Sequence, residues 1–167
     1  TSLLYHGFGI KGYRHVHSKY HDGAIHFRVQ QEVLSLRCPE CGSHQVKRRG
    51  LVMRRFRTLP IGSKPVWIEL AIQRVLCLIY GVLRQVKINF ASWRRSYTRA
   101  FERYALELSR HMTIKDVARH LGVSWDVIKD IQKRSLKRRF ARPKLHKLKQ
   151  IAIDEISIGK GHRYLTI

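Results

Sequence analysis

The sequence predicts an α+β protein in which a strand-rich part, a helical part and a second strand-rich part follow one another. Residues 23–29 alternate apolar and polar side chains, which is the period of a half-buried strand. Between residues 96 and 140 the apolar residues instead recur every three or four positions, which is the period of a helix. Residues 150–155 read as a buried strand again. These changes of period divide the chain into residues 1–92, 93–142 and 143–167.

The net charge of the chain is its strongest constraint on function. Thirty-four Lys and Arg residues face eleven Asp and Glu residues, which gives a formal charge of +23 and a pI near 10.9. Such a field attracts polyanions, and the excess is far larger than solubility requires. We therefore expect a nucleic-acid partner. The sequence shows no apolar run long enough to span a bilayer and no basic amphipathic anchor, so we expect no membrane partner.

The first part of the chain combines aromatic side chains with histidines whose spacing matches no compact metal site. We expect these histidines on the surface or on strand faces: they are His6, His15, His17, His21 and His26. Farther along, residues 66–72 and 82–88 read as strands, and turn signals lie between residues 60 and 65. Residues 31–90 are therefore expected to form short strands around a pair of cysteines.

Cys38-Pro39-Glu40-Cys41 has the spacing of a zinc knuckle, in which two thiolates hold one tetrahedral Zn²⁺. A zinc ribbon requires a second pair on a facing hairpin, and Cys77 supplies one member of it. The position of the other member is Tyr80, and neutral tyrosine is a poor zinc ligand. The fourth ligand is left open between His44 and water, and the alternative is three reduced cysteines without metal. This cysteine usage favours a reducing cytoplasm over a secreted disulfide framework.

Residues 113–129 have the parts of a helix-turn-helix in the right order. Thr113 can cap a first helix with Asp116 three residues on, and Gly122 suits the turn. Ser124 can then cap the second helix. The basic surroundings favour DNA binding over an ordinary helical hairpin. The residues expected to contact DNA from this motif are Ser124, Trp125, Lys129, Gln132 and Lys133.

A basic connector follows the helix-turn-helix. Ten Lys or Arg residues lie between Lys129 and Lys149, against a single acid, Asp130. A solvated charged helix normally mixes the two signs more evenly, so we expect these residues to contact phosphates. The DNA-binding residues predicted here are Arg138, Arg139 and Arg142.

The last part of the chain reads as the opening of a metal-dependent nuclease-like domain. The predicted strand at residues 150–155 delivers the carboxylate of Asp154 at its tip, and a second strand at residues 164–167 follows Gly159-Lys160-Gly161. Glu155 neighbours Asp154, and alternate strand residues point to opposite faces, so Glu155 is a poor candidate for the same metal site. We expect the chain to be a fragment of a DNA-processing enzyme, cut inside its catalytic domain and also lacking its natural start.

These features together resemble the ISL3 family of bacterial insertion-sequence transposases. The resemblance rests on the cysteine ribbon, the helix-turn-helix, the Asp-Glu strand followed by Gly-His-x-Tyr, and the stretch Arg57-x-Leu59-Pro60. It implies an RNase-H-like catalytic domain with a triad of two Asp and one Glu. Asp154 matches the first Asp, and the other two acids would lie beyond Ile167. Such a triad holds Mg²⁺ or Mn²⁺ for phosphoryl transfer, because hard cations prefer carboxylate oxygens.

The resemblance turns the three parts into a zinc-ribbon-like region at 1–92, a helix-turn-helix region at 93–142 and the first strands of a truncated RNase-H-like domain at 143–167. The expected role is recognition of transposon terminal repeats in double-stranded DNA, as part of a transposase that moves an insertion sequence by metal-dependent cleavage and strand transfer. We expect the fragment to be inactive alone, and a homo-oligomer is compatible with this role. The alternatives are a non-enzymatic helix-turn-helix regulator and an RNA-binding zinc-ribbon protein.

Overall fold

The computed structural model describes residues 3–142, 150, 155–161 and 163–166. The predicted catalytic acid Asp154, and most of the strand predicted for residues 150–155, lie outside this range. The chain falls into two units, Thr1–Lys133 and Arg134–Ile167. Among the described residues no helix is both long and apolar enough to cross a membrane.

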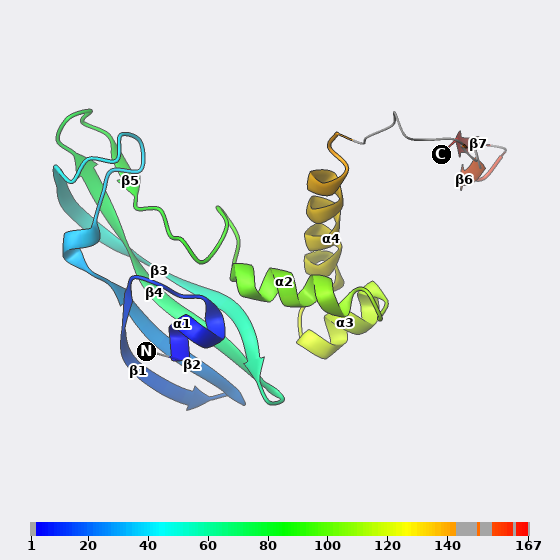
Figure 1. Cartoon of the computed structure of the whole chain (residues 1–167), viewed down its shortest axis with the longest axis horizontal. Helices are drawn as coiled ribbons and strands as arrows, with labels where there is room; N and C mark the ends of the chain where they lie inside the picture. The colour runs from blue at the N-terminus through cyan, green and yellow to red at the C-terminus, as the bar shows by residue number, and fades with distance from the viewer. Residues whose placement is uncertain (1–2, 143–149, 151–154, 162, 167) are drawn as a thin grey trace. The chain divides into compact units, whose positions relative to one another are not determined.

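A five-stranded sheet forms most of the first unit, and helices follow it (Figure 1). The elements up to the end of the sheet are α1 (Leu3–Phe8), β1 (Tyr13–His21), β2 (Ala24–Gln31), the 3-10 turn η1 (Val33–Ser35), β3 (Val46–Ile61), β4 (Lys64–Cys77) and β5 (Leu83–Gln85). The helices are α2 (Arg99–Leu108), α3 (Ile114–Leu121) and α4 (Trp125–Arg139), and the last of these crosses the boundary between the units.

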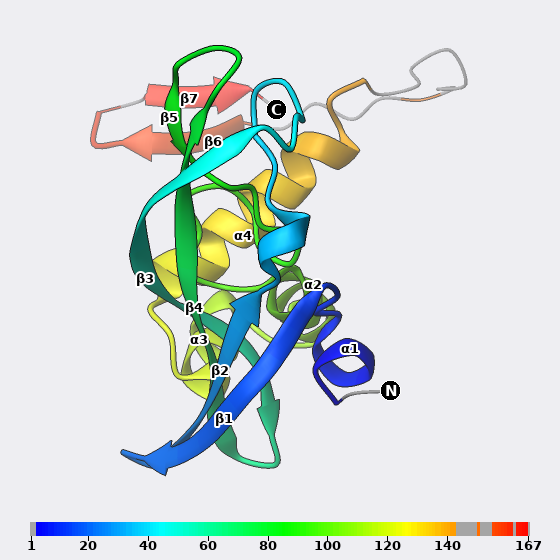
Figure 2. The ribbon, with the colours of Figure 1, turned by 90° about the vertical axis from the view of Figure 1, so that its left-hand side faces the viewer.

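The strand order of the sheet is β1-β2-β4-β3, with β5 added to the far end of β4. The β2 and β4 strands are parallel, and the other pairs are antiparallel. Because β2 pairs only with residues 66–70 of β4, the rest of β4 continues with β3 and β5 as a narrow, twisted ribbon (Figure 2). The expectation of short strands is therefore wrong for β3 and β4, which have 16 and 14 residues. The strand expected at 82–88 shortens to β5, because Val86 turns into the core.

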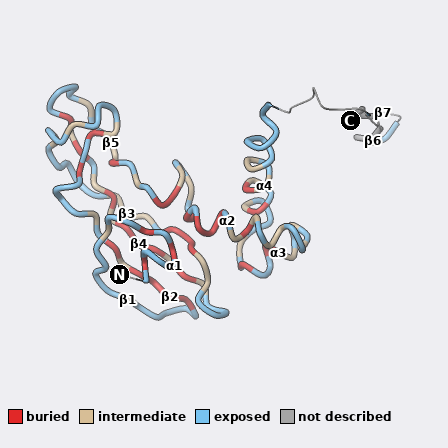
Figure 3. Tube along the Cα trace, in the orientation of Figure 1, coloured by how far each residue is buried: buried red, intermediate tan, exposed pale blue. Residues whose placement is uncertain are grey.

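Strict alternation along β4 creates the two faces of the sheet. Val66, Ile68 and Leu70 are fully buried, and the residues between them are half-buried. Helix α1 and the segment after β5 cover this apolar face. The ring centroid of Phe8 in α1 lies 5.8 Å from that of Phe27, and Phe90 lies 5.2 Å from Phe56 on β3. Buried residues accordingly gather along the central strands and where α2, α3 and α4 meet (Figure 3).

The other face of the sheet is polar and mostly basic. Two neighbouring rows of paired residues define it, His26 with Trp67 and Arg57, and Arg28 with Glu69 and Arg55. The single carboxylate in these rows is Glu69. Since the register places five cationic or aromatic side chains beside one acid, this face carries net positive charge.

The three helices form the second apolar core of the first unit, and all three were predicted from their period. Phe101, Ile128 and Ile131 have no exposed surface, and Val117 packs with them. The hydroxyl of Thr98 accepts a hydrogen bond from the backbone N–H of Phe101 and caps α2. Thr113 caps α3 in the same way through the N–H of Asp116, as predicted. Gly122 ends α3 at φ +61°, the left-handed conformation that glycine adopts without strain.

The sheet and the helices are joined at one point of β3. The backbone N–H of Arg57 donates to Ser96 O and its carbonyl accepts from the N–H of Thr98, both at 2.8 Å. The Thr98 hydroxyl also donates to the hydroxyl of Thr58 at 3.1 Å in a buried position. The Nη2 of Arg57 donates to the carbonyl of Leu121 at 2.8 Å. The start of α2 and the end of α3 are therefore both tied to β3.

The second unit contains the end of α4 and an antiparallel hairpin of β6 (Glu155–Gly159) and β7 (Arg163–Thr166). The described part of β6 starts at Glu155, and residues 151–154 of the predicted strand lie outside the described residues. A two-stranded hairpin does not define an RNase-H-like domain, so that part of the fold class stays a prediction.

Candidate nucleic-acid interface and metal centre

The three cysteines meet at one end of the β3–β4 ribbon. The register pairs Val46, at the start of β3, with Cys77, at the end of β4. This pairing brings the knuckle that precedes β3 next to the turn that follows β4. The three Sγ atoms lie within 4.8 Å of one another, and those of Cys41 and Cys77 are 3.6 Å apart. Cys38 and Cys77 are buried, whereas Cys41 is exposed.

The two turns share one backbone conformation although only the first has two cysteines. Gly42 and Gly81 both adopt positive φ, at 73° and 64°. The same two hydrogen bonds close each turn: Gly42 N–H to Cys38 O and Cys38 N–H to Ser43 O in the first, Gly81 N–H to Cys77 O and Cys77 N–H to Val82 O in the second. Tyr80 thus stands where Cys41 stands in the first turn, as the sequence predicted.

The sulfur geometry fits a tetrahedral zinc site with one position left open. Zinc–sulfur bonds of about 2.3 Å place tetrahedral sulfurs about 3.8 Å apart, close to the spacing of Cys41 and Cys77. The side chain of Tyr80 is 65% exposed, and His44 is not part of the cysteine cluster. Cys38, Cys41 and Cys77 would therefore hold the ion, and the fourth ligand would come from elsewhere.

The pKa values of the two thiols in the first turn shift in opposite directions. The pKa of the Cys38 thiol lies below its usual value, chiefly because the backbone N–H of Cys41 points to its sulfur. For Cys41 the N–H of Ser43 acts in the same direction, but burial and the neighbouring thiols outweigh it and raise the pKa. Without metal, the backbone N–H groups of the first turn therefore favour the thiolate form of Cys38.

The helix-turn-helix presents most of its predicted DNA-contacting side chains to solvent. Ser124, Trp125, Lys129 and Lys133 are exposed, and Gln132 is half-buried. The Nζ of Lys129 lies 4.6 Å from the ring centroid of Trp125, so the two form a cation–π pair one turn apart on α4. In the second unit Arg138, Arg139 and Arg142 are exposed too.

The cap predicted at Ser124 takes a different form. In the described structure the Ser124 carbonyl accepts a hydrogen bond from the N–H of Val127, and its hydroxyl caps no helix N–H. The start of α4 is therefore held by the backbone and by packing. Ser124 is exposed at the start of α4.

Packing and one ion pair fix the orientation of α4. Ile128 and Ile131 are completely buried against α2 and α3. On a neighbouring face the Nη1 of Arg95 lies 3.0 Å from a carboxylate oxygen of Asp130. Because this pair ties α4 to the segment before α2, the exposed face with Trp125 and Lys129 has a defined direction.

The polar sheet face was not predicted as part of an interface. Arg55, Arg57 and Trp67 lie far from the helix-turn-helix in sequence, and they approach it only in the folded unit. An open pocket of about 400 Å³ lies there, between the sheet and the α3–α4 turn. The only sequence signal was the stretch Arg57-x-Leu59-Pro60, which gave a resemblance but no role.

The cysteine turns and the helix-turn-helix define a zinc-ribbon protein with a DNA-binding motif. The helix-turn-helix domain of transposase family ISL3 matches residues 86–136. The zinc finger of transposase IS204/IS1001/IS1096/IS1165 matches residues 35–78. The chain therefore contains matches to the helix-turn-helix and zinc-ribbon domains of ISL3-family transposases. No solved structure matches the chain.

Two transposases illustrate the relationship. The transposase for insertion sequence element IS1001 of Bordetella parapertussis is 29% identical over 133 residues, covering 78% of this chain and 32% of the relative. The transposase for insertion sequence element IS1557 of Mycobacterium tuberculosis is 30% identical over 135 residues, covering 78% of this chain and 30% of the relative. The chain thus spans about a third of the length of the curated relatives it matches.

Proposed function

We propose that the chain is the DNA-recognition part of a transposase and binds the terminal repeats of an insertion sequence as duplex DNA. The observation that carries this proposal is the exposed face of α4. Ile128 and Ile131 fix one side of the helix in the core, and Trp125 and Lys129 lie on its exposed side. In helix-turn-helix proteins the second helix enters the major groove, and its N-terminal residues reach base edges.

The remaining basic residues fit contacts with the DNA backbone. Arg138, Arg139 and Arg142 are exposed, and arginine forms two parallel hydrogen bonds to a phosphate. Such contacts hold the protein in register but carry no sequence information. We therefore assign base reading to Trp125, Lys129, Gln132 and Lys133. The contacts with the sugar-phosphate backbone are assigned to Ser124 and the three arginines.

We further propose that zinc stabilises the tip of the β3–β4 ribbon. Cys38, Cys41 and Cys77 supply three thiolate ligands, and the fourth position is open to water or another donor because Tyr80 faces solvent. A bound zinc ion would cross-link the two knuckle turns. Its role here is structural, since the chemistry of zinc with sulfur ligands is that of a folding cross-link.

The catalytic function of the whole protein is a proposal too. We infer metal-dependent DNA cleavage and strand transfer, with Mg²⁺ or Mn²⁺ clamping the oxygens of the phosphoryl transfer. Asp154 is the residue of this chain assigned to those ions, by its match to the first acid of the family triad. Transposition requires the compartment that holds the DNA, which is the cytoplasm in bacteria.

A binding assay with two variants of the recognition helix tests the central proposal. Lys129→Ala and Gln132→Ala should each reduce discrimination between a terminal-repeat duplex and a random duplex by about 1–3 kcal/mol, the cost of removing one hydrogen-bonded side chain from a base edge. The measurement is fluorescence anisotropy with both duplexes at one salt concentration. Arg103→Ala on the exposed surface of α2 is the control, and it should leave the discrimination ratio unchanged.

Full discrimination in both variants would show that α4 is not the reading helix. Equal affinity of the unaltered chain for structured RNA and for duplex DNA would favour the RNA-binding alternative instead. The two outcomes are separate, because the first concerns the ratio between two duplexes and the second concerns the class of nucleic acid.

A further inference from the structure

We propose that the pocket between the polar face of the sheet and the α3–α4 turn binds a phosphate group of the DNA backbone. The inference rests on the proposed DNA-binding function and adds a second contact surface to it. The pocket has a volume of about 400 Å³. Cationic and aromatic residues from β2, β3, β4 and α3 line it, among them His26, Arg55, Arg57, Trp67, Arg119 and His120.

Arg57 is the centre of the argument, because its charge is buried without a counter-ion. The residue is only 7% exposed, and its guanidinium carbon lies 5.4 Å from the ring centroid of Trp67. The Nη2 of Arg57 donates a hydrogen bond to the carbonyl of Leu121, whereas its buried Nε has no hydrogen-bond partner in the described structure. No carboxylate of the described residues forms an ion pair with Arg57. A buried, unpaired cation is costly, and an anion in the pocket removes that cost.

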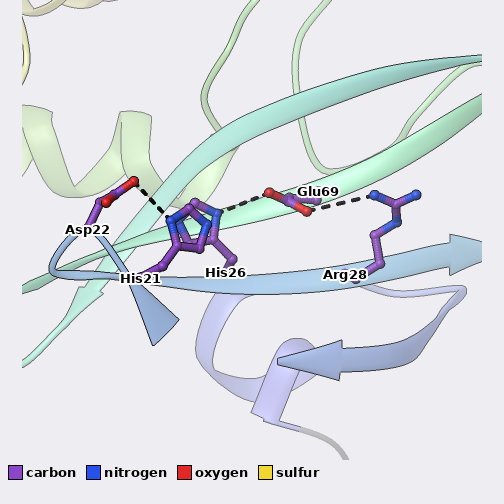
Figure 4. A network of polar contacts seen from close by, with 5 residues as sticks. All are labelled: His21, Asp22, His26, Arg28 and Glu69. Atoms are coloured by element: carbon purple, nitrogen blue, oxygen red, sulfur yellow. Dashed lines mark hydrogen bonds and ion pairs between the residues drawn. The ribbon is translucent and has the colours of Figure 1, made fainter. Parts of the chain in front are cut away.

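The acids near the pocket are already engaged by other groups. Asp22 lies 3.0 Å from His21, and Glu69 lies 3.1 Å from His26 and forms an ion pair with Arg28 at 3.7 Å; Figure 4 draws these contacts as dashed lines. The rings of His21 and His26 stack at 4.1 Å between these two carboxylates. The lining of the pocket itself contains three guanidinium groups against one carboxylate, that of Asp22. Asp116, outside the lining, pairs with Arg119 at 3.3 Å, and the other two guanidinium groups keep the pocket positive even with all its histidines neutral.

A phosphate is the anion that this lining fits best. Guanidinium groups present paired N–H donors that match two oxygens of one phosphate, and Arg57 is held rigid by Trp67 and Leu121. Arg55 and Arg119 also line the pocket and are exposed, so a phosphate held by an ester chain can reach them from solvent. A pocket closed on all sides would instead favour a small free anion.

The position of the pocket points to DNA as the source of the phosphate. Gly122 lines it, and this residue is the turn between the two helices of the motif. In helix-turn-helix complexes the first helix crosses the DNA backbone while the second enters the groove. A strand that passes the end of α3 would therefore meet Arg119 and then the basic sheet face around Arg55 and Arg28.

The test uses a double variant that removes charge from the rim and leaves Arg57 in place, because Arg57 also ties the sheet to the helices. In Arg55→Gln/Arg119→Gln the affinity for duplex DNA should fall roughly tenfold, as when one charge-assisted hydrogen bond is removed. The slope of log affinity against log salt should decrease by about 0.9, the value for one phosphate. Phosphate-ethylation interference should disappear at one backbone position and persist at those contacted by α4.

The matched control is Arg84→Gln/Arg110→Gln. Arg110 pairs with Glu107 three residues away at 3.2 Å, as Arg119 pairs with Asp116 at 3.3 Å, and both arginine side chains are well exposed, at 70% and 72%. Arg84 is an exposed strand arginine paired with Glu40. This control removes the same charge away from the pocket, and its ethylation pattern should match that of the unaltered chain. An unchanged affinity, salt slope and interference pattern in the pocket variant would overturn the inference and leave the role of α4 intact.

A second measurement separates failure of the pocket from failure of the DNA-binding proposal. Inorganic phosphate is titrated into the isotope-labelled chain while NMR follows the Arg57 Nε–H and the Trp67 indole N–H. Saturable shifts of both signals that are absent in Arg55→Gln/Arg119→Gln support the pocket even if duplex DNA does not bind. Absence of any shift, in a chain that still binds DNA, means that the pocket takes no phosphate.

Discussion

Tyr80 occupies, in the second knuckle turn, the position that Cys41 holds in the first, and the same hydrogen bonds close both turns. A tyrosine is tolerated there because its side chain is exposed and the backbone conformation depends on Gly81, not on a sulfur. The side chain at position 80 thus decides whether the second turn offers a second thiolate, while the backbone of that turn matches the first. Arg57 shows the opposite case, since one side chain and its backbone hold two cores together.

A single substitution at Tyr80 should raise the affinity for zinc. Tyr80→Cys places a fourth thiolate on a turn that already has the knuckle conformation, so we expect one tightly bound zinc per chain and slower release to a chelator. Tyr80→Phe removes the hydroxyl and should leave zinc binding as weak as in the unaltered chain. Metal analysis after purification, followed by chelator competition, gives both values. One tightly held zinc in the unaltered chain would mean that another residue already completes the site.

At the scale of elements, the helices were predictable and the long strands were not. The period of α2, α3 and α4 is local, and their caps at Thr113 and Gly122 stand in the sequence beside them. Strand β3 carries six Lys or Arg residues and no acid, so its apolar pattern is weak. The length of β3 follows from its pairing with β4, and that pairing depends on the alternating apolar residues of β4. The pocket combines residues of the sheet with residues of the α3–α4 turn, and no local sequence pattern predicts that they lie together.

The turn of the helix-turn-helix should be sensitive to the residue at Gly122. Its φ of +61° costs a residue with a Cβ about 1–2 kcal/mol, so Gly122→Ala should lower the free energy of unfolding by that amount. Gly122→Asn is the control, because asparagine adopts the left-handed conformation more readily and should be less destabilised. Denaturant unfolding followed by circular dichroism measures both. Equal stability of the alanine variant would show that the turn relaxes to another conformation.

The basic connector should act on DNA affinity and not on sequence preference. Replacing Arg138, Arg139 and Arg142 with glutamine removes exposed charges next to the end of α4. The slope of log affinity against log salt should fall by roughly 0.9 for each phosphate that the variant no longer neutralises, while the ratio between terminal-repeat and random duplex stays the same. Anisotropy titrations at several salt concentrations give slope and ratio together. An unchanged slope would place the phosphate-binding residues elsewhere on the chain.

At the scale of the whole molecule, hydrogen bonds hold the sheet and the helix-turn-helix together within the first unit. The hydrogen bonds of Arg57 and Thr98 tie the start of α2 and the end of α3 to β3, so the polar sheet face and the turn keep their relative position. The formal charge of +23 is spread over this unit and the connector. A long-range field of this size accelerates encounter with DNA of any sequence, and in our proposal the exposed face of α4 then selects among sites.

Because the features described so far serve DNA binding and not catalysis, we predict that the 167-residue chain binds DNA without cutting it. Phosphoryl transfer by two metal ions needs several carboxylates that converge on the ions, and the resemblance to the family assigns only Asp154 within these residues. The cysteine cluster does not replace them, because its soft sulfur ligands suit zinc and not Mg²⁺ or Mn²⁺. Labelled terminal-repeat duplex incubated with the chain in either metal should therefore remain intact at concentrations where anisotropy shows it fully bound. Asp154→Ala controls for contaminating nuclease, and cleavage that disappears in this variant would show that the chain assembles a working site by itself or as an oligomer.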